Sequence, residues 1–164
     1  MRLLNTNLIP MIANPQDVAL REKVMLGSMQ AGLAFSNAIL GAVHAMSHSL
    51  GGFLDLPHGL CNAALVEHVV AFNFASAPDR FKVIAETLGI DCRGLTGQQI
   101  QARLVQHLSN LKQAVGFNDT LSMHGVRMAD IPFLANHAMA DPCILTNPRK
   151  SRQRDVEVVY GEAL

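Results

Sequence analysis

The chain has 164 residues, with 13 Lys or Arg against 13 Asp or Glu and a formal net charge of zero, so its charge balance does not indicate a nucleic acid as partner. Hydrophobic residues make up 49% and charged residues 16%, which excludes a disordered chain, and the length allows one domain over residues 1–164. Only 5% of residues are aromatic and none is Trp, so we expect a core of aliphatic residues and Met, a composition that favours helices.

The first predicted elements lie in the N-terminal third of the chain. Asn14 and Pro15 are typical of a helix start and predict a helix that runs to about Gly32. Small residues then recur over residues 31–45 and allow helix backbones to approach closely. We expect this central element to end at Gly51–Gly52.

The middle of the chain carries the next helix signals. Pro57 and Gly59 bracket a predicted turn, which is followed by a helix expected over residues 60–74. A further helix is predicted over residues 79–88. It should close at Gly89, because glycine accepts a positive φ.

The C-terminal third begins with a capping box formed by Thr96 and Gln99, followed by apolar residues at helical spacing as far as Val115. Another helix is predicted over residues 130–140, and a last one is expected to be capped by Ser151. No alternation typical of strands occurs in the sequence. We therefore expect an all-α bundle of about six to eight helices with short connections.

Three cysteines, Cys61, Cys92 and Cys143, lie far apart without a C-x-x-C pair. They predict free thiols in a reducing, cytoplasmic setting and neither a disulfide framework nor a thiolate zinc site. No secretion signal opens the chain. The apolar stretch of residues 24–50 is interrupted by polar side chains, so we expect protein and not a membrane around it.

Four of the seven histidines fall within residues 44–68. His44 and His48 lie four residues apart and share one face of a helix, where two imidazoles can approach a single metal ion. His58 follows a Gly-Gly break and a proline, so the chain can fold back and bring it to that face. Imidazole binds Fe(II) and Zn(II), and an open coordination position can polarise an alcohol or carbonyl oxygen. At this point buried neutral rings that bond to backbone carbonyls remain the alternative. A metalloprotease is disfavoured, because no Glu follows His44.

The segments G-A-V-H-A-M-S-H-S-L-G-G and D-L-P-H-G-L-C-N-A resemble the signature of the iron-containing alcohol dehydrogenases. The segments A-S-A-P-D-R-F, D-I-P and L-T-N-P-R also resemble parts of that family, so the resemblance extends over nearly the whole chain. It implies the C-terminal, helical, metal-binding domain of the dehydroquinate synthase-like or iron alcohol dehydrogenase fold. In that family one Asp and three His hold a divalent metal ion, usually iron.

The resemblance assigns two of these ligands to His44 and His58, with Fe2+ as the expected ion and Zn2+ as the alternative. It implies that His48 lies beside the metal and positions substrate or relays a proton. An imidazole that does not bind the metal can transfer a proton near neutral pH. The implied activity is an NAD(P)-dependent oxidation of a small alcohol to an aldehyde or ketone.

Two parts of the family's machinery have no match in this sequence. No Asp has a His four residues later, so the D-x-x-x-H pair of ligands is missing, as is the nucleotide-binding α/β domain with its G-G-G-S loop. Residues 2–4 resemble the middle of a helix, which makes Met1 look like an artificial start. We expect the 164 residues alone to bind metal weakly and to be inactive.

A second hypothesis is a stand-alone, non-catalytic helical module that keeps the family scaffold for assembly or regulation. A domain derived from the enzyme should expose an apolar face where the nucleotide domain would dock, and would form a homo-oligomer through that face. A stand-alone module should hide it.

Other polar residues carry simpler expectations. Asp55 either orients His58 or is an ordinary loop residue. Packed or partly exposed helix residues are expected at His68, His107, His124 and His137. A solvated basic surface is expected at Arg149, Lys150, Arg152 and Arg154.

Overall fold

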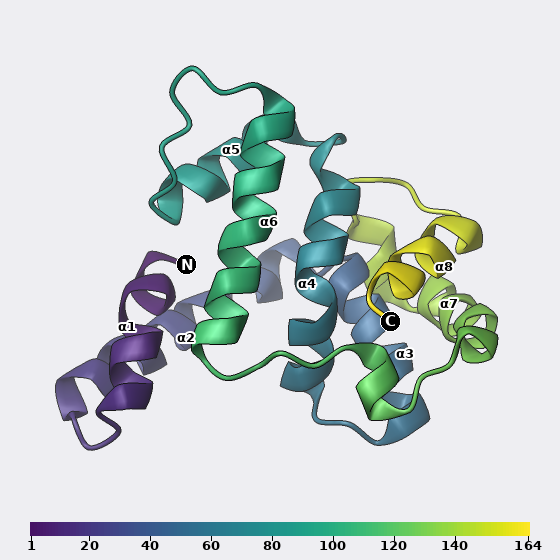
Figure 1. Ribbon diagram of the computed structural model, residues 1–164, viewed down its shortest axis with the longest axis horizontal. Coiled ribbons are helices and arrows are strands. Elements are labelled where there is room, and N and C mark those ends of the chain that lie inside the picture. The colour runs from purple at the N-terminus through teal and green to yellow at the C-terminus, as the bar shows by residue number, and fades with distance from the viewer.

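The structure, a computed structural model, describes residues 1–164 and contains eight α-helices, three short 3-10 helices and no strand (Figure 1). The α-helices are α1 (Arg2–Ala13), α2 (Val18–Ala38), α3 (Ala42–Leu54), α4 (His58–Phe74), α5 (Pro78–Thr87), α6 (Gly97–Ala114), α7 (Ile131–Ala140) and α8 (Gln153–Glu162). The 3-10 helices are η1 (Leu121–His124), η2 (Met128–Asp130) and η3 (Pro142–Thr146). The all-α prediction is confirmed.

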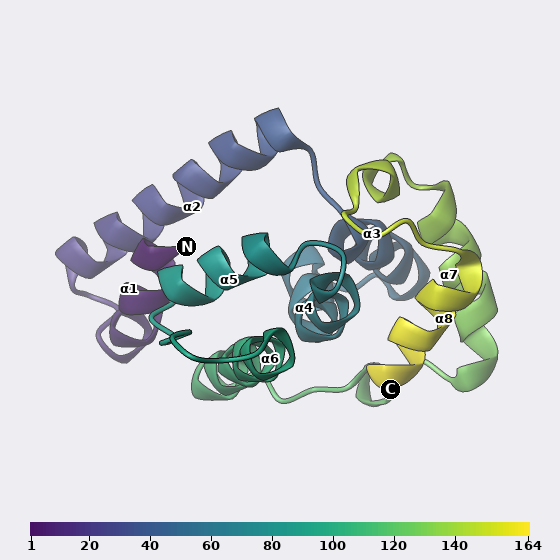
Figure 2. The ribbon, with the colours of Figure 1, turned by 90° about the horizontal axis from the view of Figure 1, so that it is seen from above.

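Helix α4 lies in the middle of the molecule, between α6 on one side and α3 and α8 on the other (Figures 1 and 2). Helix α3 also packs against α7 and η3, α7 packs against α8, and α5 covers α6. Helices α1 and α2 form a hairpin at one end, and α2 runs along the edge of the molecule in Figure 2. The arrangement buries α3 and α4 against neighbours on several sides.

Two clusters of buried apolar residues hold this arrangement. The larger comprises 17 residues from α3, α4, α7, α8 and the segment around η1, among them Met46, Leu65 and Leu134. The smaller comprises six residues around α5 and α6. Tyr160 of α8 is fully buried, and its hydroxyl donates a hydrogen bond of 2.7 Å to the carbonyl of Met46. Helix α3 is therefore fixed by both apolar packing and a buried polar contact.

The predicted start of the first long helix at Asn14–Pro15 is wrong. Asn14 instead ends α1, and α2 begins at Val18 with Asp17 as its N-cap. The Asp17 carboxylate accepts hydrogen bonds from two backbone N–H groups of the first turn, at 2.9 and 3.1 Å. The predicted end at Gly32 is also too early, because a single glycine costs a helix only about 1 kcal/mol and does not stop it.

Two further predicted boundaries beside the histidines are corrected. Helix α3 does not end at Gly51–Gly52 but continues to Leu54, and Asp55 closes it in the left-handed conformation with φ 54°. Helix α4 begins two residues earlier than predicted, directly after Pro57, so that His58 is its first residue. The connection between α3 and α4 is thus only three residues long.

The predictions for the later helices are confirmed except at one cap. Gly89 follows α5 with φ 90°, and Thr96 and Gln99 form the expected capping box, with bonds of 3.3 and 2.9 Å. Helix α7 begins at Ile131, one residue after its predicted start, and ends at Ala140 as predicted. The last helix is not capped by Ser151: its N-cap is Arg152, whose N–H donates to Asp155, while the Ser151 hydroxyl donates to the carbonyl of Arg149.

Helix α2 presents large apolar side chains to solvent. Exposed fractions are 76% for Val18, 70% for Met25 and 60% for Leu33. Across its 21 residues only Gly27 is buried. No single helix is apolar and long enough to cross a membrane, and α2 and α3 pass that test only as a pair bent by 103°.

Candidate metal centre

The corner between α3 and α4 brings three histidines together. His44 and His48 come from α3, and His58 is the first residue of α4. The ring centroid of His58 lies 5.2 Å from that of His44 and 5.2 Å from that of His48, and the centroids of His44 and His48 are 6.1 Å apart. The convergence expected from the spacing and from the chain reversal is therefore present.

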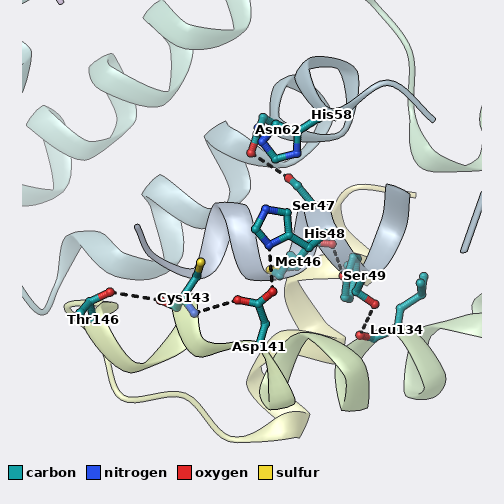
Figure 3. A network of polar contacts seen from close by, with 11 residues as sticks. Met46, Ser47, His48, Ser49, His58, Asn62, Leu134, Asp141, Cys143 and Thr146 are labelled. Atoms are coloured by element: carbon teal, nitrogen blue, oxygen red, sulfur yellow. Dashed lines mark hydrogen bonds and ion pairs between the residues drawn. The ribbon is translucent and has the colours of Figure 1, made fainter. Parts of the chain in front are cut away.

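Asn62, one turn after His58 on α4, holds the His58 ring. Its side-chain amide donates to His58 Nε2 at 2.8 Å, and its carbonyl oxygen accepts from the hydroxyl of Ser47 at 2.9 Å (Figure 3). Ser47 is fully buried on α3, so the network ties the two helices together at the site. Asn62 was not predicted as a site residue, although its spacing of four from His58 is the sequence signal that points to it.

Asp141 lies beside His48, with its carboxylate oxygen 2.8 Å from the imidazole Nδ1 (Figure 3). The carboxylate also accepts a hydrogen bond of 2.7 Å from the backbone N–H of Cys143. A carboxylate on Nδ1 fixes the tautomer that carries its proton there and leaves Nε2 as an acceptor. Asp141 was not predicted from the sequence, because the D-P-C segment indicates a helix start and nothing in it points to a histidine 93 residues away.

The ionisation states of this corner follow from burial and neighbouring charge. Burial lowers the pKa of His44, and the nearby His58 and His48 lower it further, which favours the neutral imidazole that binds metals. Burial opposes ionisation of Asp141, but hydrogen bonds from Cys143 and His48 hold its pKa below the ordinary value. Burial and the adjacent Asp141 raise the pKa of the Cys143 thiol.

Asn147 anchors η3, the short helix that follows Asp141, to the start of α3. Its side-chain oxygen accepts from the N–H of Ala42 at 3.1 Å and from the amide of Asn73 at 2.8 Å. Its own amide donates to Asn73 and to the carbonyl of Arg149, both at 2.8 Å. These buried contacts fix Asp141 and Cys143 relative to the helix that carries His44 and His48.

The other histidines are engaged elsewhere. His68 is packed as expected, with its side chain 24% exposed, and burial lowers its pKa. His107 bonds to Asn5 at 2.7 Å, His124 lies 3.0 Å from the carboxylate of Asp119, and His137 donates to the carbonyl of Phe133.

The remaining expectations concern Asp55 and the basic segment. Asp55 is exposed and ends α3 without a hydrogen bond to His58, in agreement with its interpretation as a loop residue. Arg149 is not simply solvated: its guanidinium stacks 4.0 Å from the centroid of Phe72 and donates to the carbonyl of that residue. The expectation of a wholly solvated basic surface is therefore wrong at this position. All three cysteines are free thiols, as predicted.

The donor set at the corner fits a divalent ion of the iron or zinc type in part. His44 and His58 offer two imidazole nitrogens from two rigid helices, and catalytic sites of such ions use three or four protein ligands. The further ligands would have to come from other groups. His48, with 42% of its side chain exposed and held by Asp141, remains open to solvent.

Comparison with known proteins identifies related sequences and structures. The sequence profile of the Fe-containing alcohol dehydrogenase family, C-terminal part, matches residues 1–164. The 1,3-propanediol dehydrogenase of Klebsiella pneumoniae is 36% identical over 162 residues, which cover 99% of this chain and 42% of that protein. The NAD-dependent methanol dehydrogenase of Bacillus methanolicus is 36% identical over 164 residues, or 43% of its length. The crystal structure of a 1,3-propanediol oxidoreductase superposes with a TM-score of 0.96 at 35% identity, covering 99% of this chain and 43% of that one. The chain thus spans less than half the length of these relatives.

Proposed function

We propose that this chain, which belongs to the Fe-containing alcohol dehydrogenase family, is the catalytic-metal part of an NAD(P)-linked enzyme that interconverts small alcohols with aldehydes or ketones. The observation that carries the proposal is the convergence of His44, His48 and His58 at one corner of the fold, with ring centroids 5.2 to 6.1 Å apart. The similarity to the NAD-dependent methanol dehydrogenase of Bacillus methanolicus supports a nicotinamide nucleotide as the cofactor.

In this proposal His44 and His58 are ligands of an Fe2+ ion, with Zn2+ as the alternative. Such an ion, when bound, supplies a Lewis acid for the alcohol oxygen, and the nicotinamide supplies the hydride acceptor. His44 is ready to bind, because its surroundings favour the neutral ring. His58 is held at Nε2 by the Asn62 amide, so metal binding at that nitrogen requires this hydrogen bond to be exchanged for the metal bond.

His48 is proposed to transfer the proton of the reacting hydroxyl. Asp141 keeps Nδ1 protonated, so Nε2 carries a lone pair that can accept a proton. The carboxylate also stabilises the imidazolium that forms. Because the side chain is 42% exposed, the proton can pass on to water. Asp141 is thus a positioning residue for His48.

We propose that residues 1–164 form a single helical domain and that nucleotide binding and the remaining metal ligands belong to other parts of a complete enzyme. Two imidazoles alone should hold a divalent ion weakly, since each missing ligand removes a bond. The isolated chain is therefore expected to show no NAD(P)-dependent turnover. Metal-dependent alcohol oxidation by the purified 164 residues would overturn this part of the proposal.

The exposed apolar face of α2 is proposed to mediate contact between copies of the isolated chain. Met25, Met29 and Leu33 recur at helical spacing on it, and each is more than half exposed. Sedimentation analysis should show concentration-dependent association that Leu33→Glu weakens. A monomer at all concentrations would contradict it.

The ligand assignment is tested by titrating the chain with Zn2+ in a calorimeter. Mutation of a residue that only contacts a metal ligand lowers the metal affinity about 10- to 100-fold. Removal of a ligand itself, in His44→Ala or His58→Ala, should therefore lower the Zn2+ affinity by at least that factor. His137→Ala is the matched control, because His137 lies on α7 and bonds to its own helix. Equal affinities in all four proteins would refute the assignment.

The activity itself can be tested in a chimera in which this chain replaces the matching C-terminal part of the Klebsiella pneumoniae 1,3-propanediol dehydrogenase. The TM-score of 0.96 to a 1,3-propanediol oxidoreductase supports such an exchange. The chimera should reduce NAD+ with an alcohol, and His44→Ala and His58→Ala should abolish that turnover while His137→Ala preserves it. A folded, soluble chimera with metal bound and no turnover would count against the proposed function.

A further inference from the structure

We propose that His48, Asp141 and Cys143 form a second divalent-cation site, suited to a thiophilic ion such as Zn2+, beside the corner formed by His44 and His58. An imidazole nitrogen, a carboxylate oxygen and a thiol Sγ from these residues all lie within 4.8 Å of one another, and the nitrogen that faces Asp141, at 2.8 Å, is Nδ1. Figure 3 shows the Cys143 thiol and the Asp141 carboxylate on the same side of the His48 ring.

The spacing of these atoms is close to what a zinc ion requires. Zn–N and Zn–O bonds of about 2.0 to 2.2 Å and Zn–S bonds of about 2.3 Å separate tetrahedral ligand atoms by roughly 3.3 to 3.8 Å. The three donor atoms can reach such distances by small side-chain rotations. His48 and Asp141, now 2.8 Å apart, have to separate by a fraction of an ångström to admit the ion.

The chemistry of the three donors selects the class of ion. Thiolate and imidazole are the ligands of zinc and related metals, whereas magnesium and calcium take oxygen ligands. The cation would replace the proton between His48 and Asp141 and the proton of the thiol, as metal binding to such groups generally does. Three protein ligands leave one position of a tetrahedral ion for water.

The site is rigidly supported and reachable. His48 lies on α3, which is buried against α4 and α7, and Asp141 is fixed by the N–H of Cys143 at 2.7 Å. His48 is 42% exposed and Cys143 is half-buried, so an ion can enter from solvent. The other thiols, Cys61 and Cys92, are both fully enclosed in the two apolar clusters. Cys143 is thus the thiol that can meet a metal ion.

Occupation of this site has a consequence for the proposed reaction. A cation bound to Nδ1 replaces the hydrogen bond to Asp141 and leaves the proton of the neutral ring on Nε2. His48 then has no free nitrogen that can accept a proton from the substrate. The two metal sites share a corner but no ligand, so each can be removed separately. Zinc at the second site would therefore act as an inhibitor of a complete enzyme, independently of the ion on His44 and His58.

The test uses the 164-residue chain and Co2+ as a spectroscopic substitute for Zn2+. Cobalt bound to a thiolate gives a sulfur-to-metal charge-transfer band in the near ultraviolet, which imidazole ligands alone do not produce. The band should appear in the unmodified chain, persist in His58→Ala, and disappear in Cys143→Ser. Cys92→Ser is the matched control and should keep it, because Cys92 is buried in the smaller cluster.

A second measurement uses the unmodified chain alone and so does not depend on the folding of a variant. Zn2+ should slow the alkylation of Cys143 by iodoacetamide at least tenfold, as read by peptide mass spectrometry, while Mg2+ should not. Persistence of the cobalt band in Cys143→Ser, its absence from the unmodified chain at saturation, or alkylation unaffected by Zn2+ would overturn the second site. Failure of the proposed function gives a different pattern: in a Cys143→Ser background, which removes the second site, His44→Ala and His58→Ala leave the calorimetric Zn2+ affinity unchanged, while the chain with Cys143 intact shows the cobalt band.

Discussion

Replacement of Asn147 by Ala should destabilise the protein strongly, because this one side chain joins three segments. Asn147 is 9% exposed and connects the start of α3, the end of α4 and the segment after η3. The truncation removes the acceptor for the N–H of Ala42 and both partners of the Asn73 side chain. Asn73 is itself only 6% exposed and cannot turn to solvent.

The magnitude follows from the groups left without partners. Each buried donor or acceptor that loses its partner costs about 1 to 3 kcal/mol, and loss of a helix N-cap costs about 1 kcal/mol. Because the Asn73 side chain and the N–H of Ala42 both lose their hydrogen-bond partners, we expect the free energy of unfolding to fall by about 3 kcal/mol. Because Asp141 and Cys143 lie on the segment that Asn147 anchors, the cation site at His48 should also weaken.

Urea denaturation followed by circular dichroism measures the change. Asn110→Ala is the matched control: Asn110 is exposed on α6 and accepts a single bond from Gln106, so its loss should stay within about 0.5 kcal/mol. A loss below about 1 kcal/mol in Asn147→Ala would refute the reasoning, since it would mean that water satisfies the stranded groups as well as the side chain does.

Three further predictions concern α8, α4 and the site. Tyr160→Phe removes the hydroxyl that donates to Met46 and should lower the free energy of unfolding by about 1 kcal/mol in urea, and an unchanged value would contradict the buried bond. Burial lowers the pKa of His68, so the unfolded chain binds the proton more tightly and stability should fall as the pH drops below about 6.5. His68→Gln should reduce that fall in thermal melts across this range, and identical acid profiles would refute the assignment. Asn62→Ala frees His58 Nε2 and should tighten Zn2+ binding about two- to tenfold in calorimetry, and weaker binding would show that Asn62 supports the metal-binding form of His58.

Local signals predicted much of the fold because they depend on neighbours in sequence. The capping box of Thr96 and Gln99 acts within one turn, and the shared face of His44 and His48 follows from helical periodicity alone. Gly51–Gly52 misled the prediction of a helix end. The penalty of about 1 kcal/mol for each glycine is outweighed by the burial of neighbouring side chains such as Leu50.

The parts of the site that sequence did not reveal depend on long-range packing. Asp141 meets His48 across 93 residues, and Asn147 caps α3 across 105. Neither pairing leaves a periodic trace, because an Asp or Asn in a loop has the same local signature whether or not it meets a distant helix. The family resemblance led to the assignment of His44 and His58. It did not indicate Asp141 and Asn62, which hold His48 and His58 in place.

The central claim, that His44 and His58 bind a catalytic divalent ion, is tested most directly by anomalous diffraction from crystals of the chain grown with Fe2+ under anaerobic conditions. The account predicts an anomalous peak at the corner of α3 and α4, about 2.0 to 2.2 Å from a ring nitrogen of each of these two histidines. A well-diffracting crystal at saturating iron with no peak there, or with iron bound only elsewhere on the surface, would contradict it.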